Sequence, residues 1–192
     1  MMLGRLAAHC ALVFACLGLS NLHLAQTASP FQSGSAQFDL GRGHAGALEV
    51  GEPIEDVYQG FGRDRIKLVA RFAEGMFTPA LEIALAGSAV VPALAVDVRE
   101  VPCARFSVWA IEVYDRRFRT KEGLGIGSSL RDVRRSYGTQ IVVGEDKTSA
   151  LAKEIGISFG ISSAAPADNA VVISVNVVAD PQLVRQQRCP GR

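Results

Sequence analysis

The sequence predicts an α+β fold in which two repeats of a short helix plus antiparallel strands share one sheet, with the helices on one face. Three observations support this prediction. Residues 48–62 align without a gap with residues 124–138. Both stretches carry apolar side chains at the spacing of a short helix. The segments after each stretch alternate apolar and polar residues, as strands of an antiparallel sheet with one solvated face do.

The composition is that of a folded globular protein. The 192 residues carry a formal net charge of +1, and 20% of them are charged. A nucleic-acid-binding domain has a larger excess of lysine and arginine, so we expect no nucleic-acid partner.

The N-terminal residues, 1–25, have the pattern of a secretory signal peptide. One positive charge precedes a mostly apolar stretch, residues 6–19. This stretch is shorter than the ~20 residues of a membrane-spanning helix, so no span is expected in the mature form. We therefore expect an exported protein, periplasmic or secreted, cleaved near Ala25 or Ala28. The alternatives are a buried N-terminal helix and a chain that is lipid-anchored through Cys16.

The expected domain begins where the apolar pattern begins. Residues 26–47 are rich in Gly, Ser, Ala and Gln and read as a flexible lead, with room for one short strand near residues 37–40. The expected organisation after this lead is a single α+β domain over residues 48–180, made of repeats 48–120 and 121–180, and a C-terminal tail, residues 181–192.

Each aligned stretch reads as a short strand, a tight turn at glycine and a helix of about two turns. A glycine at the turn reverses the chain into the helix, and a second glycine suits the left-handed residue after its last turn. An aspartate in the first turn meets the helix dipole. This structural role is favoured over a pair of symmetry-related catalytic acids. The equivalent positions are Gly51 with Gly127, Asp56 with Asp132, and Gly62 with Gly138.

The glycine run EGLGIGSSL at residues 122–130 raises the question of a phosphate-binding loop. The first stretch provides a control, because it retains only the last glycine and places Glu49 where Gly125 stands. A carboxylate there would repel a phosphate, and the P-loop spacing is absent. We therefore expect the shared glycine to shape a turn, and we expect no nucleotide or other cofactor.

The strands are expected from period-2 alternation and from the short connections between them. Residues 66–73 and 170–178 alternate most regularly. The full set of expected strands is 66–73, 80–85, 93–99, 106–118, 140–143, 155–161 and 170–178.

Few residues suggest catalysis. His44 is the single histidine after the signal peptide, so neither a histidine-based triad nor a zinc site with several histidines is expected. We predict no catalytic residue and no metal ligand, and an enzymatic role is not favoured. The mature chain keeps Cys103 and Cys189, which we expect to form a disulfide in an oxidising compartment. The alternative is two unpaired thiols.

A basic cluster precedes and enters the second expected helix. It could face anionic lipid headgroups or an acidic partner, or it could be a solvated strand edge and helix face. The cluster consists of Arg116, Arg117, Arg119, Lys121, Arg131, Arg134 and Arg135.

The shared pattern of a glycine, an Asp-Val pair and an aromatic–glycine pair resembles small exported bacterial proteins built from helix-plus-sheet units. The outer-membrane assembly lipoproteins of the BamE (SmpA/OmlA) type look like one such unit, and the β-lactamase inhibitory proteins look like a tandem pair. The resemblance implies a secreted or periplasmic, non-catalytic binding or scaffolding protein whose partner is an envelope protein or an anionic surface. The alternatives are a cell-envelope hydrolase that uses carboxylates and an outer-membrane-associated lipoprotein.

Overall fold

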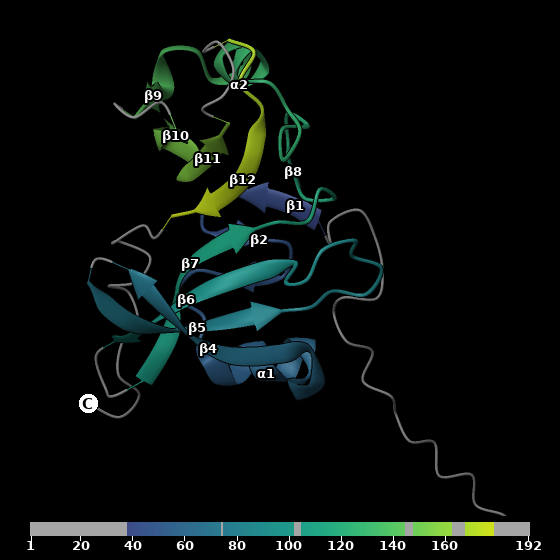
Figure 1. Cartoon of the computed structure of the whole chain (residues 1–192), viewed down its shortest axis with the longest axis vertical. Coiled ribbons are helices and arrows are strands. Elements are labelled where there is room, and N and C mark those ends of the chain that lie inside the picture. Colours follow the sequence, from purple (N-terminus) through teal and green to yellow (C-terminus); the bar gives the residue numbers. More distant parts are fainter. Residues whose placement is uncertain (1–37, 74, 102–104, 145–147, 163–167, 179–192) are drawn as a thin grey trace, which may run out of the picture.

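A computed structural model describes residues 38–73, 75–101, 105–144, 148–162 and 168–178 (Figure 1). These residues form two β-sheets and only two α-helices, each of eight residues. The predicted α+β fold, with two helix-plus-strand repeats sharing one sheet, is therefore wrong. Strands dominate the architecture, and the helices are short elements at its surface.

The larger sheet contains eight strands, and every neighbouring pair in it is antiparallel. Its spatial order is β4 (Ile66–Ala73), β5 (Met76–Ile83), β6 (Leu94–Val101), β7 (Arg105–Val113), β12 (Val172–Val177), β11 (Ile157–Ile161), β10 (Ser149–Ala152) and β9 (Ile141–Val143).

A smaller sheet of four short strands was not expected. It has the order β3 (Leu48–Glu49), β2 (His44–Ala45), β1 (Asp39–Gly41) and β8 (Arg119–Thr120), and β1 pairs with β8 in parallel. β1 lies where the sequence left room for a short strand near residues 37–40, whereas the strand β2 replaces part of the expected flexible lead. Phe38 packs edge-on against the buried Phe118 at 5.2 Å between ring centroids.

The two helices lie where the apolar spacing predicts them, at α1 (Ile54–Phe61) and α2 (Leu130–Tyr137). The backbone before each helix has the same geometry. Gly51 and Gly127 have φ of 92° and 93°, a conformation that only glycine adopts at little cost. Their amides donate to the carbonyls of Val108 and Val172, both at 2.8 Å. Each helix is followed by a 3-10 turn and four antiparallel strands, β4–β7 after α1 and β9–β12 after α2, and the two sets of strands meet where β7 pairs with β12.

Glycines end both helices, and a serine begins the second. Gly62 and Gly138, the residues after α1 and α2, both have positive φ, but their ψ angles of 140° and −128° differ from the expected left-handed helical conformation. The hydroxyl of Ser129 accepts from the amide of Asp132 and donates to its carboxylate at 2.6 Å. This hydrogen bond is the first cause of the lowered pKa of Asp132. Asp56 lies in the first turn of α1. Within the described ranges, the 3-10 turns are η3 (Arg63–Arg65), η4 (Gly138–Gln140) and η5 (Lys153–Ile155).

Helices and sheets enclose one hydrophobic core. Val57 and Phe61 of α1, and Val133 and Tyr137 of α2, are buried in it. Within the described part of the chain, no helix has the length and apolar character needed to cross a bilayer.

The hairpin of β4 and β5 extends beyond the rest of the larger sheet. β4 and β5 pair from Ile66↔Ile83 out to Ala73↔Met76, whereas β5 and β6 stop pairing at Ala80↔Asp97. The outer part of the hairpin, residues 70–79, therefore leaves β6, and we call it the arm. Figure 1 shows the hairpin projecting from the sheet at the left of the view.

Candidate functional site

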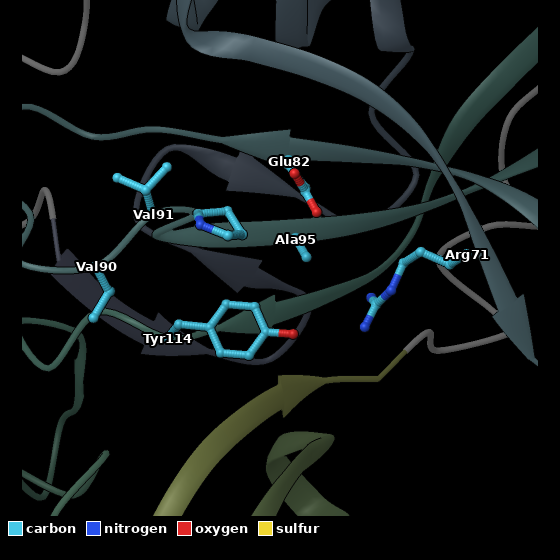
Figure 2. Close-up of a pocket in the computed structure, with 7 residues that line it drawn as sticks. Arg71, Glu82, Val90, Val91, Ala95 and Tyr114 are labelled. Carbon is cyan, nitrogen blue, oxygen red and sulfur yellow. The ribbon is translucent and has the colours of Figure 1, made fainter.

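An open cleft of about 330 Å³ lies on the polar face of the larger sheet. Its volume is at the lower end of the range of small-ligand sites. Figure 2 shows Arg71 and Tyr114 pointing toward the same space, with Val90 and Val91 on the side opposite Arg71. The lining residues are Arg71, Glu82, Val90, Val91, Pro92, Ala95 and Tyr114.

Arg71 connects the arm to the sheet. Its Nη2 donates to Oε2 of Glu112 at 2.8 Å, and its Nη1 donates to Oδ1 of Asp97 at 3.5 Å. Glu112 is in β7, three strand spacings from β4, or about 14 Å in a flat sheet. It is level with Lys67, so Arg71 is displaced from it by a further four residues, or about 13 Å, along β4. The two side chains together cannot span both displacements, so the arm must curve over the polar face, and this curvature forms one wall of the cleft.

Negative charge predominates along the polar wall. Glu82 lines the cleft, and Asp97 and Glu112 flank it, while Arg71 is the single cation among the lining residues. Lys67 lies 3.9 Å from Glu82, but its side chain is 77% exposed, so water screens that pair strongly.

Tyr114 contributes a hydroxyl that is protonated at neutral pH. Burial, followed by the hydrogen bond with Glu112, raises the pKa of Tyr114 to about 12. The hydrogen bond to Glu112 also raises the pKa of Arg71. The cleft therefore presents a neutral phenol and a permanently charged guanidinium.

The apolar wall is the loop between β5 and β6. Hydrogen bonds in both directions between Ser88 and Val90 shape this loop, and Arg117 donates to the carbonyl of Ala86 at 3.0 Å. Val91 remains 83% exposed. A second hollow of about 400 Å³ adjoins the cleft, because Val90 and Tyr114 line both.

Replacing Arg71 with methionine should release the arm. We expect the free energy of unfolding to fall by about 1–2 kcal/mol, since the ion pairs are only partly exposed to solvent. Cleavage of the arm by a nonspecific protease should become faster. Lys67→Met is the matched control, because Lys67 lies on the same face of β4 and should change stability by less than about 0.5 kcal/mol. Equal effects of the two changes would contradict the bridging role of Arg71.

Most of the basic cluster is engaged in local contacts. Arg117 pairs with Asp115 and lies over the ring of Phe38, and Arg119 donates to the carbonyl of Ile126 at 2.9 Å. In α2, Arg131 donates to Asn169, Arg134 to Asp168 and Arg135 to Asp132. Arg116 and Lys121 are exposed. A surface for an anionic partner at these residues stays a prediction.

Several expected features lie outside the described residues. These are the signal peptide, Cys16, Cys103, Cys189 and the tail from residue 181 onward. His44 is described, and its Nε2 lies 3.2 Å from Asp39. Where the structure describes the chain, no group of three or more His, Cys, Asp and Glu side chains is placed to hold a metal ion.

No sequence pattern indicated the cleft residues Arg71, Glu82 and Tyr114 or the flanking Glu112. The alternation in residues 66–73 correctly placed Arg71 on the polar face of its strand. Its partners are 26 and 41 residues away in the chain, however, and only the strand order and register bring them together.

Comparison with known proteins supports the fold alone. No family model matches the chain, and no curated protein matches it. The structure is similar to that of the uncharacterized protein yfeY from Escherichia coli, with a TM-score of 0.50 and 14% sequence identity over 74% of this chain and 99% of that chain. None of these results tests the resemblance to the BamE-type proteins or the β-lactamase inhibitory proteins.

Proposed function

We propose that this protein is an exported, non-catalytic binding protein, and that the cleft receives a basic side chain of a partner protein. The observation that carries the proposal is the composition of the cleft. An apolar wall formed by Val90, Val91 and Pro92 faces a polar wall with an excess of carboxylates. A lysine or arginine side chain matches this arrangement, because its aliphatic stem can pack on apolar surface while its charged end meets carboxylates.

The charge balance favours a cation over an anion. The guanidinium of Arg71 is already paired with Asp97 and Glu112. Glu82 is bonded weakly by comparison, through the exposed Lys67. An incoming cation can therefore pair with Glu82. The negative charges of Asp97 and Glu112 also attract it, and both carboxylates can remain paired with Arg71.

A hydrolase that uses carboxylates is the second candidate. It needs two acids that converge on a substrate, one of them available to donate a proton. In the cleft, Asp97 and Glu112 hold Arg71 instead, and Glu82 is the single carboxylate among the lining residues. This arrangement favours binding over hydrolysis.

Export of the protein is proposed from the N-terminal pattern of the sequence alone. The alternative is attachment to the cell envelope through a lipid on Cys16.

Binding of N-acetyl-lysine methylamide, followed by NMR shifts or calorimetry, tests the proposal. N-acetyl-norleucine methylamide, which lacks the ammonium group, is the matched ligand control. We expect weak binding of the lysine probe, with Kd of the order of millimolar, and shifts confined to the cleft. The Glu82→Gln change should raise the Kd of the lysine probe about fivefold, which is the effect expected from the loss of a partly exposed ion pair.

Glu100→Gln is the protein control, because Glu100 is an exposed carboxylate of β6 that does not line the cleft. It should leave binding of the lysine probe unchanged. Equal binding of the lysine and norleucine probes would contradict the proposal. So would a loss of affinity that is the same for Glu82→Gln and Glu100→Gln.

A further inference from the structure

The two edges of the larger sheet differ in length. β9 at one edge has three residues, whereas β4 at the other has eight. Short edge strands resist pairing, and long apolar ones invite it. Among the described residues no strand pairs with the outer side of β4. Leu68 and Phe72 of β4 are 64% and 66% exposed.

The hydrogen bonds of β4 show which of its backbone groups face outward. The amide of Ala84 donates to the carbonyl of Arg65 at 2.9 Å, which makes this a hydrogen-bonded pair. Such pairs alternate in an antiparallel ladder, so Lys67↔Glu82 and Val69↔Ala80 also exchange bonds. The alternate residues of β4 therefore direct their N–H and C=O groups away from β5, toward the outer edge. These residues are Leu68, Ala70 and Phe72.

Leu68, Ala70 and Phe72 also share one apolar face of the β4–β5 hairpin. Phe72 lies opposite Phe77 of β5, with their ring centroids 5.1 Å apart, and Phe77 is 74% exposed. Ala70 lies opposite Pro79, which is also exposed. An open row of backbone donors and acceptors thus coincides with a contiguous exposed apolar surface, and this combination marks a site of strand pairing.

A second copy of β4 complements this edge in one register. If the two strands run antiparallel with Ala70 opposite the partner's Ala70, Leu68 lies opposite the partner's Phe72 on both sides of the two-fold axis. Val69 then lies opposite the partner's Arg71. No two cations are directly opposed in this register, so the apolar pairs form without a repulsive pair.

Neighbouring registers oppose like charges. Centring the pair on Val69 places Lys67 opposite the partner's Arg71, and centring it on Arg71 places that residue opposite itself. Centring it on Leu68 places Arg65 opposite the partner's Arg71. Directly opposed like charges destabilise a strand pair. Charge and hydrophobicity therefore select the same register.

We propose that two copies of this protein form a two-fold symmetric dimer through antiparallel pairing of β4 with β4, centred on Ala70. The pairing joins the two larger sheets into one continuous sheet. Each exposed Phe72 then packs beside Leu68 of the partner subunit. Leu68 pairs with the buried Leu81 of β5 in its own chain, so a row of apolar side chains crosses the interface. This proposal is independent of the ligand of the cleft.

Sedimentation over a range of protein concentrations tests the dimer, with Ala70→Pro as the decisive variant. The amide of Ala70 faces the outer edge, so proline there should spare the β4–β5 ladder while it removes a donor to the partner. We expect the unaltered chain to approach twice its monomer mass at high concentration. Ala70→Pro should raise the dissociation constant about tenfold or more. Ala70→Ser keeps the amide and should dimerise like the unaltered chain.

A charge pair tests the register. Leu68→Lys and Phe72→Glu should each weaken the dimer, and the two changes together should restore it, because the new lysine then faces the partner's new glutamate. Within one chain these positions lie four residues apart along an extended strand, too far to pair with each other.

Amide hydrogen exchange gives an independent readout. The amides of Leu68, Ala70 and Phe72 should become protected as protein concentration rises, while those of Lys67 and Val69 are protected at every concentration. A chain that stays monomeric overturns the proposal, and so does a dimer that Ala70→Pro leaves intact. Protection of Leu68, Ala70 and Phe72 that does not depend on concentration would also overturn it, since another segment of the same chain would then cover the edge.

Discussion

Replacing Phe159 with alanine is expected to lower the free energy of unfolding by about 3–5 kcal/mol. Phe159 lies in β11 with no exposed surface, and its ring stacks on that of Tyr137 at 6.2 Å between centroids. Tyr137 is the last residue of α2, so this contact attaches the helix to the sheet. The truncated side chain would leave a cavity that its neighbours fill only in part, and the lost contacts account for the large effect.

Phe77→Ala is the matched control for this prediction, because it makes the same chemical change at a side chain that is 74% exposed. We expect a change in stability within about 0.5 kcal/mol. Urea unfolding followed by the fluorescence of Trp109 measures both variants, at a protein concentration low enough to avoid self-association. A difference of less than about 1 kcal/mol between the two variants would show that Phe159 is not part of a tightly packed core.

Arg117→Met should destabilise the protein by about 2–4 kcal/mol, because it leaves a buried carboxylate without its cation. Asp115 is 4% exposed, and Oδ2 of its side chain accepts from Nη2 of Arg117 at 2.6 Å. Arg117 also donates to the carbonyl of Ala86 and lies 4.3 Å from the ring centroid of Phe38. One side chain thus joins the start of the smaller sheet, the loop beside the cleft and the end of β7.

Two variants separate the buried charge from the other contacts of Arg117. Arg116→Met removes an exposed neighbouring cation and should change stability by less than about 0.5 kcal/mol. Adding Asp115→Asn to Arg117→Met should recover part of the loss, since the uncompensated charge is then gone. A double variant that is less stable than Arg117→Met alone would contradict the ion-pair explanation.

The pH dependence of the Arg117→Met effect follows from the pKa of Asp115. Burial raises this pKa, but hydrogen bonds from the side chain and backbone of Arg117 outweigh burial, and the net shift is downward from 3.8. The ionised carboxylate therefore stabilises the fold above pH 3.8, and this stability is lost as pH falls through the lowered pKa. Arg117→Met removes the hydrogen bonds and the charge of the guanidinium but keeps the backbone amide of residue 117, so it weakens the downward shift of this pKa. The difference in stability between the unaltered chain and Arg117→Met should accordingly shrink in acid.

The local elements of this protein were accessible to sequence reasoning. The helical spacing of Val57 with Phe61, and of Val133 with Tyr137, correctly located α1 and α2, and all four side chains are buried. Alternation correctly located β4 at residues 66–73. These patterns are local, because the side chains that define one face of an element lie within a few residues of each other.

The smaller sheet escaped prediction because its strands are two or three residues long. Such a strand is too short to show alternation, and its stability comes from neighbours rather than from its own sequence. The parallel pairing of β1 with β8 joins residues 39–40 to residues 119–120. The glycine-rich composition of residues 41–46 predicts a flexible linker. The pairing of β1 with β8 instead holds this segment against the rest of the fold.

By itself, the sequence determined where the chain turns, where two amphipathic helices form and that residues 66–73 form a strand, but not that Leu68 and Phe72 of this strand are exposed. The tertiary structure decided which strands are neighbours, how the arm curves and which side chains enclose the cleft. The physical reason is the range of the interactions involved. Helix and strand periodicity is set within one element, whereas the bonds from Arg71 to Asp97 and Glu112 span 26 and 41 residues and exist only once strand order and register are set.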